Sequence, residues 1–323
     1  MDSRRPLLRH RIGPPMTAAC DRNKPTPYAH LGDVARAVIE AGPEARIRFI
    51  KETHWIGYAQ ADLIIARMKE LLDAPRIDRP ECLVILGETN NGKTSIIQRF
   101  AKSVVPIERE DGGGSEWPVI TIQAPPVADE KRLYMAILQK VGGLGASLRT
   151  RASLFNATIT TLSGIGTRML VIDEIHHLIS GSTNQHRVCL NALKYLANEL
   201  RLSIVVAGIS SAHYALGVID PQLENRFKPM KLPRWTDGNN FRRLLASIET
   251  LLPLKNPSVL QKPAMAKRLA ELSDGKIGEL LTILIAATAE AIRSGKEQID
   301  ESLILRVQEL APAYRRRTMQ DGF

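Results

Sequence analysis

The chain has 323 residues, more than one average domain needs, and 44% of them are hydrophobic, which is enough for a sizeable core. Lys and Arg number 44 against 34 Asp and Glu; the resulting charge of +10 favours contact with nucleic acid or an anionic membrane, although a soluble protein without such a partner can have the same balance. No stretch approaches the roughly 20 consecutive apolar residues of a membrane-spanning helix, and the Arg-rich N-terminus lacks the apolar region of a secretory signal, so we expect a cytoplasmic protein.

The N-terminal part shows no strand pattern. Residues 1–30 mix Arg, Pro and polar residues without periodicity, which predicts a flexible basic arm that either touches DNA or is simply a solvated tail. Helical patterns begin at Leu31, and His54–Asp73 has apolar residues at spacings of three and four, as in an amphipathic helix. We expect a helical extension over residues 31–78.

From residue 79, short apolar runs alternate with helical patterns. The predicted strands are Cys82–Gly87, Pro118–Ala124, Arg168–Asp173, Leu202–Ile209 and Arg226–Pro233, and the predicted helices are Lys93–Ser103, Asp129–Gly142 with Asp129 as N-cap, and Arg187–Leu200. This alternation predicts a three-layer α/β fold with a mostly parallel sheet over residues 79–235, which binds ligands at the carboxyl ends of its strands. Helical patterns near Leu260–Leu272, Ile277–Arg293 and Asp300–Leu310 predict a helical cap over residues 236–312, followed by a basic tail at 313–323.

The segment Gly87–Ser95, GETNNGKTS, matches the phosphate-loop pattern between a strand and a helix. Its glycines let successive N–H groups point at one anion at the positive end of the following helix. We expect nucleotide contacts from the whole loop: Gly87, Glu88, Thr89, Asn90, Asn91, Gly92, Lys93, Thr94 and Ser95. Lys93 is expected to reach the β- and γ-phosphates, and the Thr94 hydroxyl to coordinate Mg²⁺.

The predicted strand Arg168–Asp173 ends in an acid, and a second acid, Glu174, follows directly. Asp173 can hold Mg²⁺ through water, and Glu174 can polarise the attacking water, because phosphoryl transfer depends mainly on positioning and charge stabilisation. His176 and His177 come next, but adjacent helical residues point about 100° apart, and neither a carboxylate set nor the scattered Cys20, Cys82 and Cys189 completes a tetrahedral site. We expect one histidine to pack near the γ-phosphate or to cap polar groups.

Two further residues have two interpretations each. Ser210 follows the strand Leu202–Ile209, where its hydroxyl can contact the γ-phosphate or cap the next helix. Arg226 can neutralise charge at a neighbouring subunit's nucleotide in a ring or filament, or it can pair locally with Glu224.

The motifs GETNNGKT, MLVIDEIHHL, NELRLSIVVAGI, DPQLENRF and DGKIGELLTIL together resemble the TniB family of transposition proteins, relatives of TnsC among the AAA+ ATPases, and HWIGY is also similar to that family. The resemblance covers roughly Leu31 to Pro312. It implies an AAA+ core with a mostly parallel five-stranded sheet and a helical lid, which binds ATP and Mg²⁺ and hydrolyses ATP weakly unless DNA or a partner stimulates it.

The same resemblance implies a bacterial regulator of DNA transposition, cytoplasmic and associated with the nucleoid when on DNA. Such a protein binds double-stranded DNA, forms a homo-oligomeric ring or helical filament with ATP, and recruits or activates a DDE transposase, with a target-selection protein as another partner. By this analogy Asp173 and Glu174 form the Walker B pair, Ser210 is at the sensor-1 position and Arg226 is the arginine finger. Trp55, Ile56 and Tyr58 resemble the segment that flanks the adenine, or else they only pack the first helix onto the core.

One position departs from the AAA+ pattern. Gly278 stands where many AAA+ proteins have a sensor-2 arginine, and Lys276 and Glu279 are the nearest charges. This departure leaves the coupling of the lid to the γ-phosphate open and favours a weak or DNA-dependent ATPase.

The sequence says less about DNA contacts. Basic groups on an interior face of a filament would neutralise phosphates with little dependence on base sequence. The candidates are Lys131, Arg132, Arg149 and Arg151, each of which can instead be a solvated helix end. The C-terminal YRRRTMQDGF can serve the transposase or the target-selection partner.

Two alternative functions remain open. A helicase loader of the DnaC or IstB type would have a similar core and differ in its partner, a replicative helicase. An ATP-gated scaffold would bind ATP and DNA with little hydrolysis, and Glu174 argues against that reading.

Overall fold

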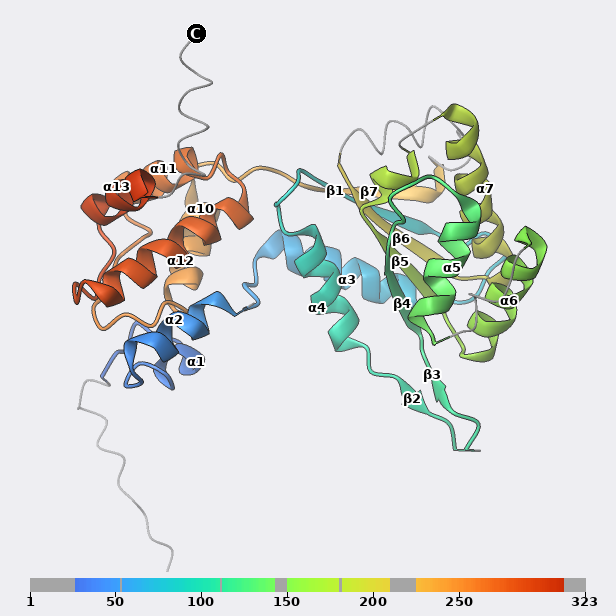
Figure 1. The fold of residues 1–323 in the computed structure, drawn as a ribbon, viewed down its shortest axis with the longest axis horizontal. Helices are drawn as coiled ribbons and strands as arrows, with labels where there is room; N and C mark the ends of the chain where they lie inside the picture. The colour runs from blue at the N-terminus through green and yellow to red at the C-terminus, as the bar shows by residue number, and fades with distance from the viewer. Residues whose placement is uncertain are drawn as a thin grey trace, which may run out of the picture.

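The computed structural model describes residues 27–52, 54–110, 112–142, 150–179, 182–209 and 225–310. Within them the chain forms an α/β lobe and a helical lobe, connected by the segment before α3 (Ala59–Asp73) and the segment after β7 (Phe227–Leu232) (Figure 1). No helix in these ranges is both long and apolar enough to cross a membrane.

The sheet of the α/β lobe is parallel throughout. Its strands lie in the order β4 (Val119–Gln123), β5 (Met169–Asp173), β6 (Ser203–Gly208), β1 (Cys82–Gly87) and β7. Strands β1, β5 and β6 are buried at every residue, as parallel strands covered on both faces must be. The register pairs Cys82 with Phe227 and Gly87 with Leu232, so the carboxyl ends of the strands share one edge.

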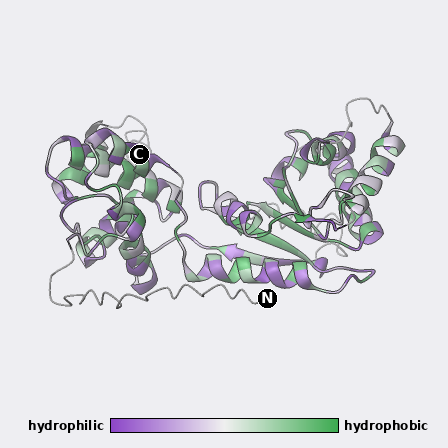
Figure 2. Cartoon of the chain, turned by 90° about the horizontal axis from the view of Figure 1, so that it is seen from below, coloured by the Kyte–Doolittle hydropathy of each residue, from purple (hydrophilic) through white to green (hydrophobic). Residues whose placement is uncertain are grey.

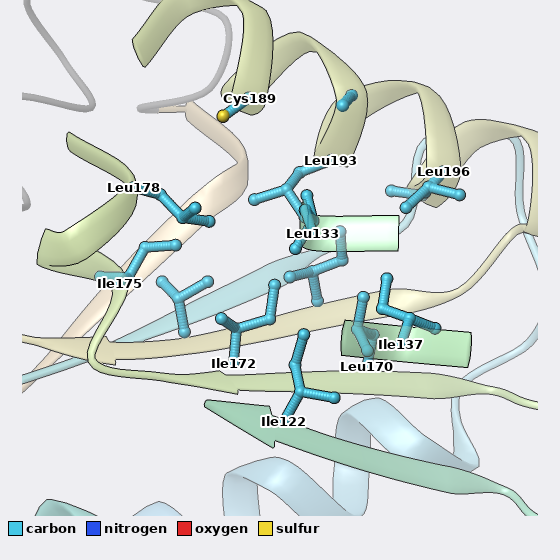
Figure 3. Packing of buried hydrophobic residues seen from close by; sticks show 14 of the residues in the cluster. Ile122, Leu133, Ile137, Leu170, Ile172, Ile175, Leu178, Cys189, Leu193 and Leu196 are labelled. Atoms are coloured by element: carbon cyan, nitrogen blue, oxygen red, sulfur yellow. The ribbon is translucent and has the colours of Figure 1, made fainter. Parts of the chain in front are cut away.

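Helices cover both faces of this sheet. One face packs against α5 (Glu130–Lys140), α6 (Arg151–Gly164) and α7 (Thr183–Leu200), and the other against α3 and α4 (Lys93–Ser103). Alternate strand residues supply the two cores: Leu170 and Ile172 face α5 and α7 (Figure 3), whereas Val171 faces α3 and α4. Figure 2 shows that the strands are mostly hydrophobic, whereas the helices have both hydrophobic and hydrophilic residues. The predicted three-layer α/β fold with a five-stranded parallel sheet is confirmed.

The helical lobe combines helices from both ends of the described chain (Figure 1). Its helices are α1 (Asp33–Arg36), α2 (Pro43–Lys51), α10 (Asn239–Glu249), α11 (Pro263–Leu272), α12 (Ile277–Arg293) and α13 (Glu301–Leu310). Ile47 and Ile50 of α2 share a hydrophobic core with Leu284 of α12. The helices of residues 31–78 therefore divide between the lobes, since α2 packs with α12 while α3 packs on the sheet.

Several local predictions can be compared with the structure. Helix α4 has the predicted bounds, and Asp129 caps α5 as predicted by accepting a hydrogen bond of 2.8 Å from the Arg132 N–H. The segment His54–Tyr58, predicted to be helical, has no regular secondary structure, and α3 begins only at Ala59. The reason is that Ile56 packs in the core of the helical lobe while Trp55 packs against that of the α/β lobe, which a single helical face cannot achieve.

The loop after α4 also differs from the prediction. It contains a short antiparallel hairpin of β2 (Ile107–Glu108) and β3 (Ser115–Glu116) instead of only irregular structure. Helices α6 and α10 were not predicted.

A buried ion pair fastens α2 to the helical lobe. Arg46, only 3% exposed, donates to Glu297 (Nη1 to Oε1, 2.8 Å) and to the carbonyl oxygen of Pro253 (Nε to O, 2.9 Å). Removing one partner of a buried pair leaves the other charge uncompensated.

We therefore expect Arg46→Ala to lower the free energy of unfolding by about 3 kcal/mol, measured by urea denaturation. The matched control is Arg306→Ala, since the Arg306 side chain is 61% exposed and lies 3.3 Å from Glu290. Exposed pairs contribute at most about 1 kcal/mol. Equal losses in the two variants would contradict this role of Arg46.

Candidate functional site

The phosphate loop turns from the carboxyl end of β1 into α4. Gly92 has φ +86° and Asn90 φ +62°, the left-handed conformations that curl the loop. Helix α4 begins at Lys93, and no side chain caps its N-terminus. The first N–H groups of α4 are therefore not taken by a capping side chain and can bind an anion.

Lys93 is held inside the loop. Its side chain is 4% exposed, and its Nζ donates hydrogen bonds of 2.8 Å each to the carbonyl oxygens of Gly87 and Glu88. Burial lowers the pKa of the Lys93 ammonium, and the negative charges of Glu174 and Asp173 oppose that shift. These carboxylates keep a cation favourable at a place where burial alone would disfavour it.

Two oxygen ligands suited to Mg²⁺ lie together at the carboxyl edge of the sheet. The Thr94 hydroxyl donates a hydrogen bond of 2.6 Å to Oδ2 of Asp173, the last residue of β5. Hard divalent cations prefer such oxygen donors, so this pair fits Mg²⁺.

Glu174 follows Asp173 in a left-handed conformation. Its φ is +57°, uncommon for a residue with a Cβ, and its N–H donates to Asp173 Oδ1 over 2.9 Å. Such backbone strain clusters at functional sites, because the surrounding structure must hold it in place. Here it turns Glu174 toward the cavity that Lys93 also lines.

This cavity, of about 170 Å³, lies between the phosphate loop, the segment before α3 and the start of α12. Its lining includes predicted site residues from four separate segments: Trp55, Ile56 and Tyr58, then Asn90, Asn91, Gly92, Lys93, Thr94 and Ser95, then Glu174, and finally Gly278. Gly87, Glu88 and Thr89 belong to the loop but do not line the cavity. The fold thus brings together residues that are far apart in the sequence.

Aromatic side chains border the cavity. The ring of Tyr58 meets that of Trp235 edge-on with centroids 5.2 Å apart, and the Arg99 guanidinium carbon lies 5.7 Å from the ring centroid of Trp55. Burial, helped by the charge of Asp62, raises the pKa of Tyr58 to about 12. Tyr58 and Asn91 also line a second cavity of about 520 Å³ between α3, the segment after β7 and α10.

The departure at Gly278 has a steric explanation. Its N–H donates to the carbonyl oxygen of Asn90 over 3.0 Å, and an added Cβ would lie only 1.9 Å from Asn90 Oδ1 and 2.4 Å from its Cγ. A side chain at position 278 would therefore displace the exposed Asn90 side chain from its present position on the phosphate loop.

The two histidines after Glu174 do not diverge as expected. They lie on a 3₁₀ helix, η2 (Ile175–Ile179), and their rings stack with centroids 4.5 Å apart. His176 Nδ1 lies 3.0 Å from Glu174 Oε2, and one ligand atom from each of the three residues lies within 4.8 Å of the others. The Glu174 carboxylate therefore lies beside both histidines, and His176 contacts it directly. Glu174 is also the residue that is expected to polarise the attacking water.

Arg226 lies at the opposite edge of the sheet. It directly precedes β7, beside the amino end of β1, and its Nη1 donates to Asn198 Oδ1 over 2.8 Å. The predicted partner Glu224 and the predicted sensor Ser210 lie outside the described residues.

Three of the basic residues expected to contact DNA lie close together. Lys131 and Arg132 are exposed in the first turn of α5, and Arg151 begins α6 with its guanidinium 3.6 Å from Glu130. The starts of α5 and α6 are thus neighbours. Arg149 lies outside the described residues.

Comparison with known protein families assigns the chain to one family. Residues 46–237, more than half of the chain, match the family described as Bacterial TniB protein. No curated protein matches the chain significantly.

Many solved structures are similar in fold, and three of them illustrate the likeness. The Aeropyrum pernix ORC2 protein in its ADPNP and ADP complexes has a TM-score of 0.59 at 15% identity and aligns with 80% of this chain and 70% of its own. The Aeropyrum pernix ORC1 protein in complex with DNA has a TM-score of 0.56 at 18% identity. The alignment covers 81% of this chain and 68% of the ORC1 chain. A Walker-type ATPase of Pyrococcus abyssi has a TM-score of 0.54 at 15% identity. The alignment covers 84% of this chain and 79% of the ATPase chain. The chain therefore has the AAA+ fold and belongs to the TniB family.

Proposed function

We propose that this chain is an ATPase that assembles on double-stranded DNA with ATP and Mg²⁺ and regulates DNA transposition. In this role it recruits or activates a DDE transposase, with a target-selection protein as a further partner. The observation that carries the proposal is the convergence of the phosphate loop, Glu174, the Trp55–Tyr58 segment and Gly278 on one cavity in a TniB family member.

Each residue has a role that its position supports. The N–H groups at the start of α4 and the ammonium of Lys93 bind the phosphates, and Thr94 and Asp173 would hold Mg²⁺. When bound, Mg²⁺ would neutralise charge on the β- and γ-phosphate oxygens. Glu174 orients and polarises the attacking water. By analogy with the AAA+ family alone, Ser210, which lies outside the described residues, would add a hydroxyl near the γ-phosphate.

The location of Arg226 supports action on a neighbouring subunit. The phosphate loop follows the last residue of β1, whereas Arg226 lies beside its first residue. At about 3.3 Å per residue, the two ends of the strand are separated by roughly 16 Å, more than an arginine side chain spans. Arg226 therefore does not reach the nucleotide of its own chain, and we propose that it leaves Asn198 to serve the nucleotide of the next protomer in a ring or filament.

Arg226→Ala should slow ATP turnover by the assembled protein about tenfold, a small effect for an arginine finger because a weak ATPase gains less from it. The control is Arg201→Gln. The Arg201 side chain is 56% exposed, and its guanidinium lies 2.8 Å from Asp78. Mixing Arg226→Ala with Glu174→Gln protein, which still binds ATP and assembles, should restore part of the activity, because one of the two kinds of mixed interface combines an intact Glu174 with an intact Arg226. Equal loss in a demonstrable monomer, or no recovery on mixing, would contradict action between subunits.

The neighbouring starts of α5 and α6 support a DNA-binding surface. Lys131, Arg132 and Arg151, with Arg149 between them in sequence, place basic groups near the carboxyl edge of the sheet. Contacts of this kind bind phosphates, so binding should weaken steeply with salt and depend little on base sequence.

Electron microscopy tests the proposed function. The purified full-length protein with duplex DNA should form ordered rings or filaments with a non-hydrolysable ATP analogue and not with ADP. Identical images with both nucleotides, or no ordered assembly, would contradict it.

A further inference from the structure

Four charged side chains connect the phosphate loop to the helical lobe. The Arg234 guanidinium, just after β7, donates two hydrogen bonds of 2.7 Å to the Glu88 carboxylate, Nε to Oε1 and Nη2 to Oε2. Its Nη1 donates to Asp274 Oδ1 over 2.6 Å, in the turn between α11 and α12. The Lys276 ammonium lies 3.1 Å from Asp274 Oδ2 and 3.5 Å from Glu88 Oε2. We call these four residues the Glu88 network.

Glu88 links this network to the nucleotide site through its own backbone. Its carbonyl oxygen accepts the hydrogen bond from Lys93 Nζ over 2.8 Å, while its carboxylate is held by Arg234. The Arg234 guanidinium holds the pKa of Glu88 below its usual range, so the carboxylate is charged at neutral pH. A negative charge in a loop that binds phosphates disfavours binding unless cations neutralise it. Arg234 and Lys276 provide that neutralisation.

Two backbone hydrogen bonds accompany the network. Trp235 N–H donates to the Gly275 carbonyl oxygen over 2.8 Å, and Gly278 N–H donates to the Asn90 carbonyl oxygen over 3.0 Å. An added Cβ on Gly275, where φ is +63°, would lie 2.3 Å from the Trp235 carbonyl oxygen. The start of α12 therefore packs backbone to backbone on the chain after β7 and on the phosphate loop. The exchange of these two amide hydrogens reports whether that contact is closed.

We propose that Arg234 is a positioning residue of the nucleotide site, which holds the start of α12 against the phosphate loop through the Glu88 network and neutralises Glu88. Its effect on nucleotide affinity rests on the proposed ATPase function, whereas its effect on the contact between the lobes does not. The side chains of Glu88 and Arg234 are 43% and 46% exposed, so water and salt reach the pair. Such a network is weak enough to open and is screened by salt.

Hydrogen exchange of the full-length protein without nucleotide tests the contact directly. Arg234→Gln should speed exchange at the Trp235 and Gly278 amides about fivefold to tenfold and leave the interior of α12 unchanged. The matched control is Arg242→Gln, because Arg242 makes a similar two-bond pair with Asp237, at 3.0 Å each, in which no residue of the phosphate loop takes part. Raising salt to about 1 M, where the Debye length is about 3 Å, should reproduce the faster exchange in the unaltered protein.

The result that overturns the proposal is equal exchange in Arg234→Gln and the unaltered protein, or equal acceleration by Arg242→Gln. Should Arg234→Gln not fold, Arg234→Lys keeps the charge but loses the two-bond geometry, so its exchange should be intermediate. The salt series needs no variant at all.

Nucleotide affinity provides the second readout, with a fluorescent ATP analogue and Mg²⁺. Arg234→Gln should weaken binding about fivefold, because the Glu88 charge is then poorly compensated. Adding Glu88→Gln to that variant should recover affinity, since the repulsive carboxylate is gone. Additive losses in the double variant would overturn the proposal. If even the unaltered protein binds no nucleotide, the proposed function fails while the exchange experiment still decides the role of Arg234.

Discussion

Replacing Lys93 by alanine should weaken ATP binding by about a hundredfold or more and abolish ATP-dependent association with DNA. The Lys93 ammonium is buried within the loop, beside the start of α4, and two hydrogen bonds to carbonyl oxygens of the loop hold it there. A phosphate bound there would replace these neutral carbonyl acceptors with a charged one and so add an ionic attraction to the hydrogen bonds of the ammonium.

The measurement is a fluorescence titration with nucleotide, followed by a DNA-binding assay with and without ATP. Lys102→Ala is the control, because Lys102 is exposed in the last turn of the same helix. An Lys93→Ala protein that still assembles on DNA only when ATP is present would show that the loop does not have this role.

Glu174→Gln should leave ATP binding within about twofold and slow hydrolysis by a factor of about 10² to 10⁴, the usual contribution of a general base. Glutamine keeps the shape and the left-handed backbone but cannot polarise water as a carboxylate does. Because release from DNA is expected to follow hydrolysis, the variant should remain assembled on DNA when ATP is supplied.

Phosphate release under multiple turnover, with a parallel binding titration, separates the two effects. The control is Glu279→Gln, a carboxylate that contacts Asn90 Nδ2 at 3.4 Å but lies on α12. Its turnover should change less than about threefold. Unchanged hydrolysis in Glu174→Gln would remove Glu174 from the catalytic role.

The sheet could be predicted because each central strand is a short apolar run ending in a polar motif, such as Cys82–Gly87 before the phosphate loop. Helix α6 gave no such signal, since its sequence, RASLFNATITTLSG, mixes Ser and Thr among its apolar residues and has no distinct apolar face. Helix α10 has Phe241, Leu244, Leu245 and Ile248 at helical spacing, but it follows Gly238 and so lacks the capping side chain that signals a helix start.

The residues of the site could be predicted where they form contiguous motifs or where the family resemblance assigned them, as for Trp55, Tyr58 and Gly278, but the contacts between distant segments could not. The phosphate loop and the Asp173–Glu174 pair are contiguous motifs, so their chemistry follows from spacing. The pairing of Glu88 with Arg234 joins residues 146 positions apart, and a single sequence contains no information about it. At Gly278 the sequence revealed the missing arginine, and the structure adds the reason, namely the close approach of Asn90.

We propose that the cavity bordered by Lys93, Glu174 and Gly278 binds ATP. Calorimetric titration of the purified full-length protein with ATP and Mg²⁺ tests it most directly, with the Lys93→Ala protein as reference. We expect one nucleotide per chain, with binding lost in Lys93→Ala. The absence of any heat of binding from the unaltered protein, or unaltered binding by Lys93→Ala, would contradict the claim.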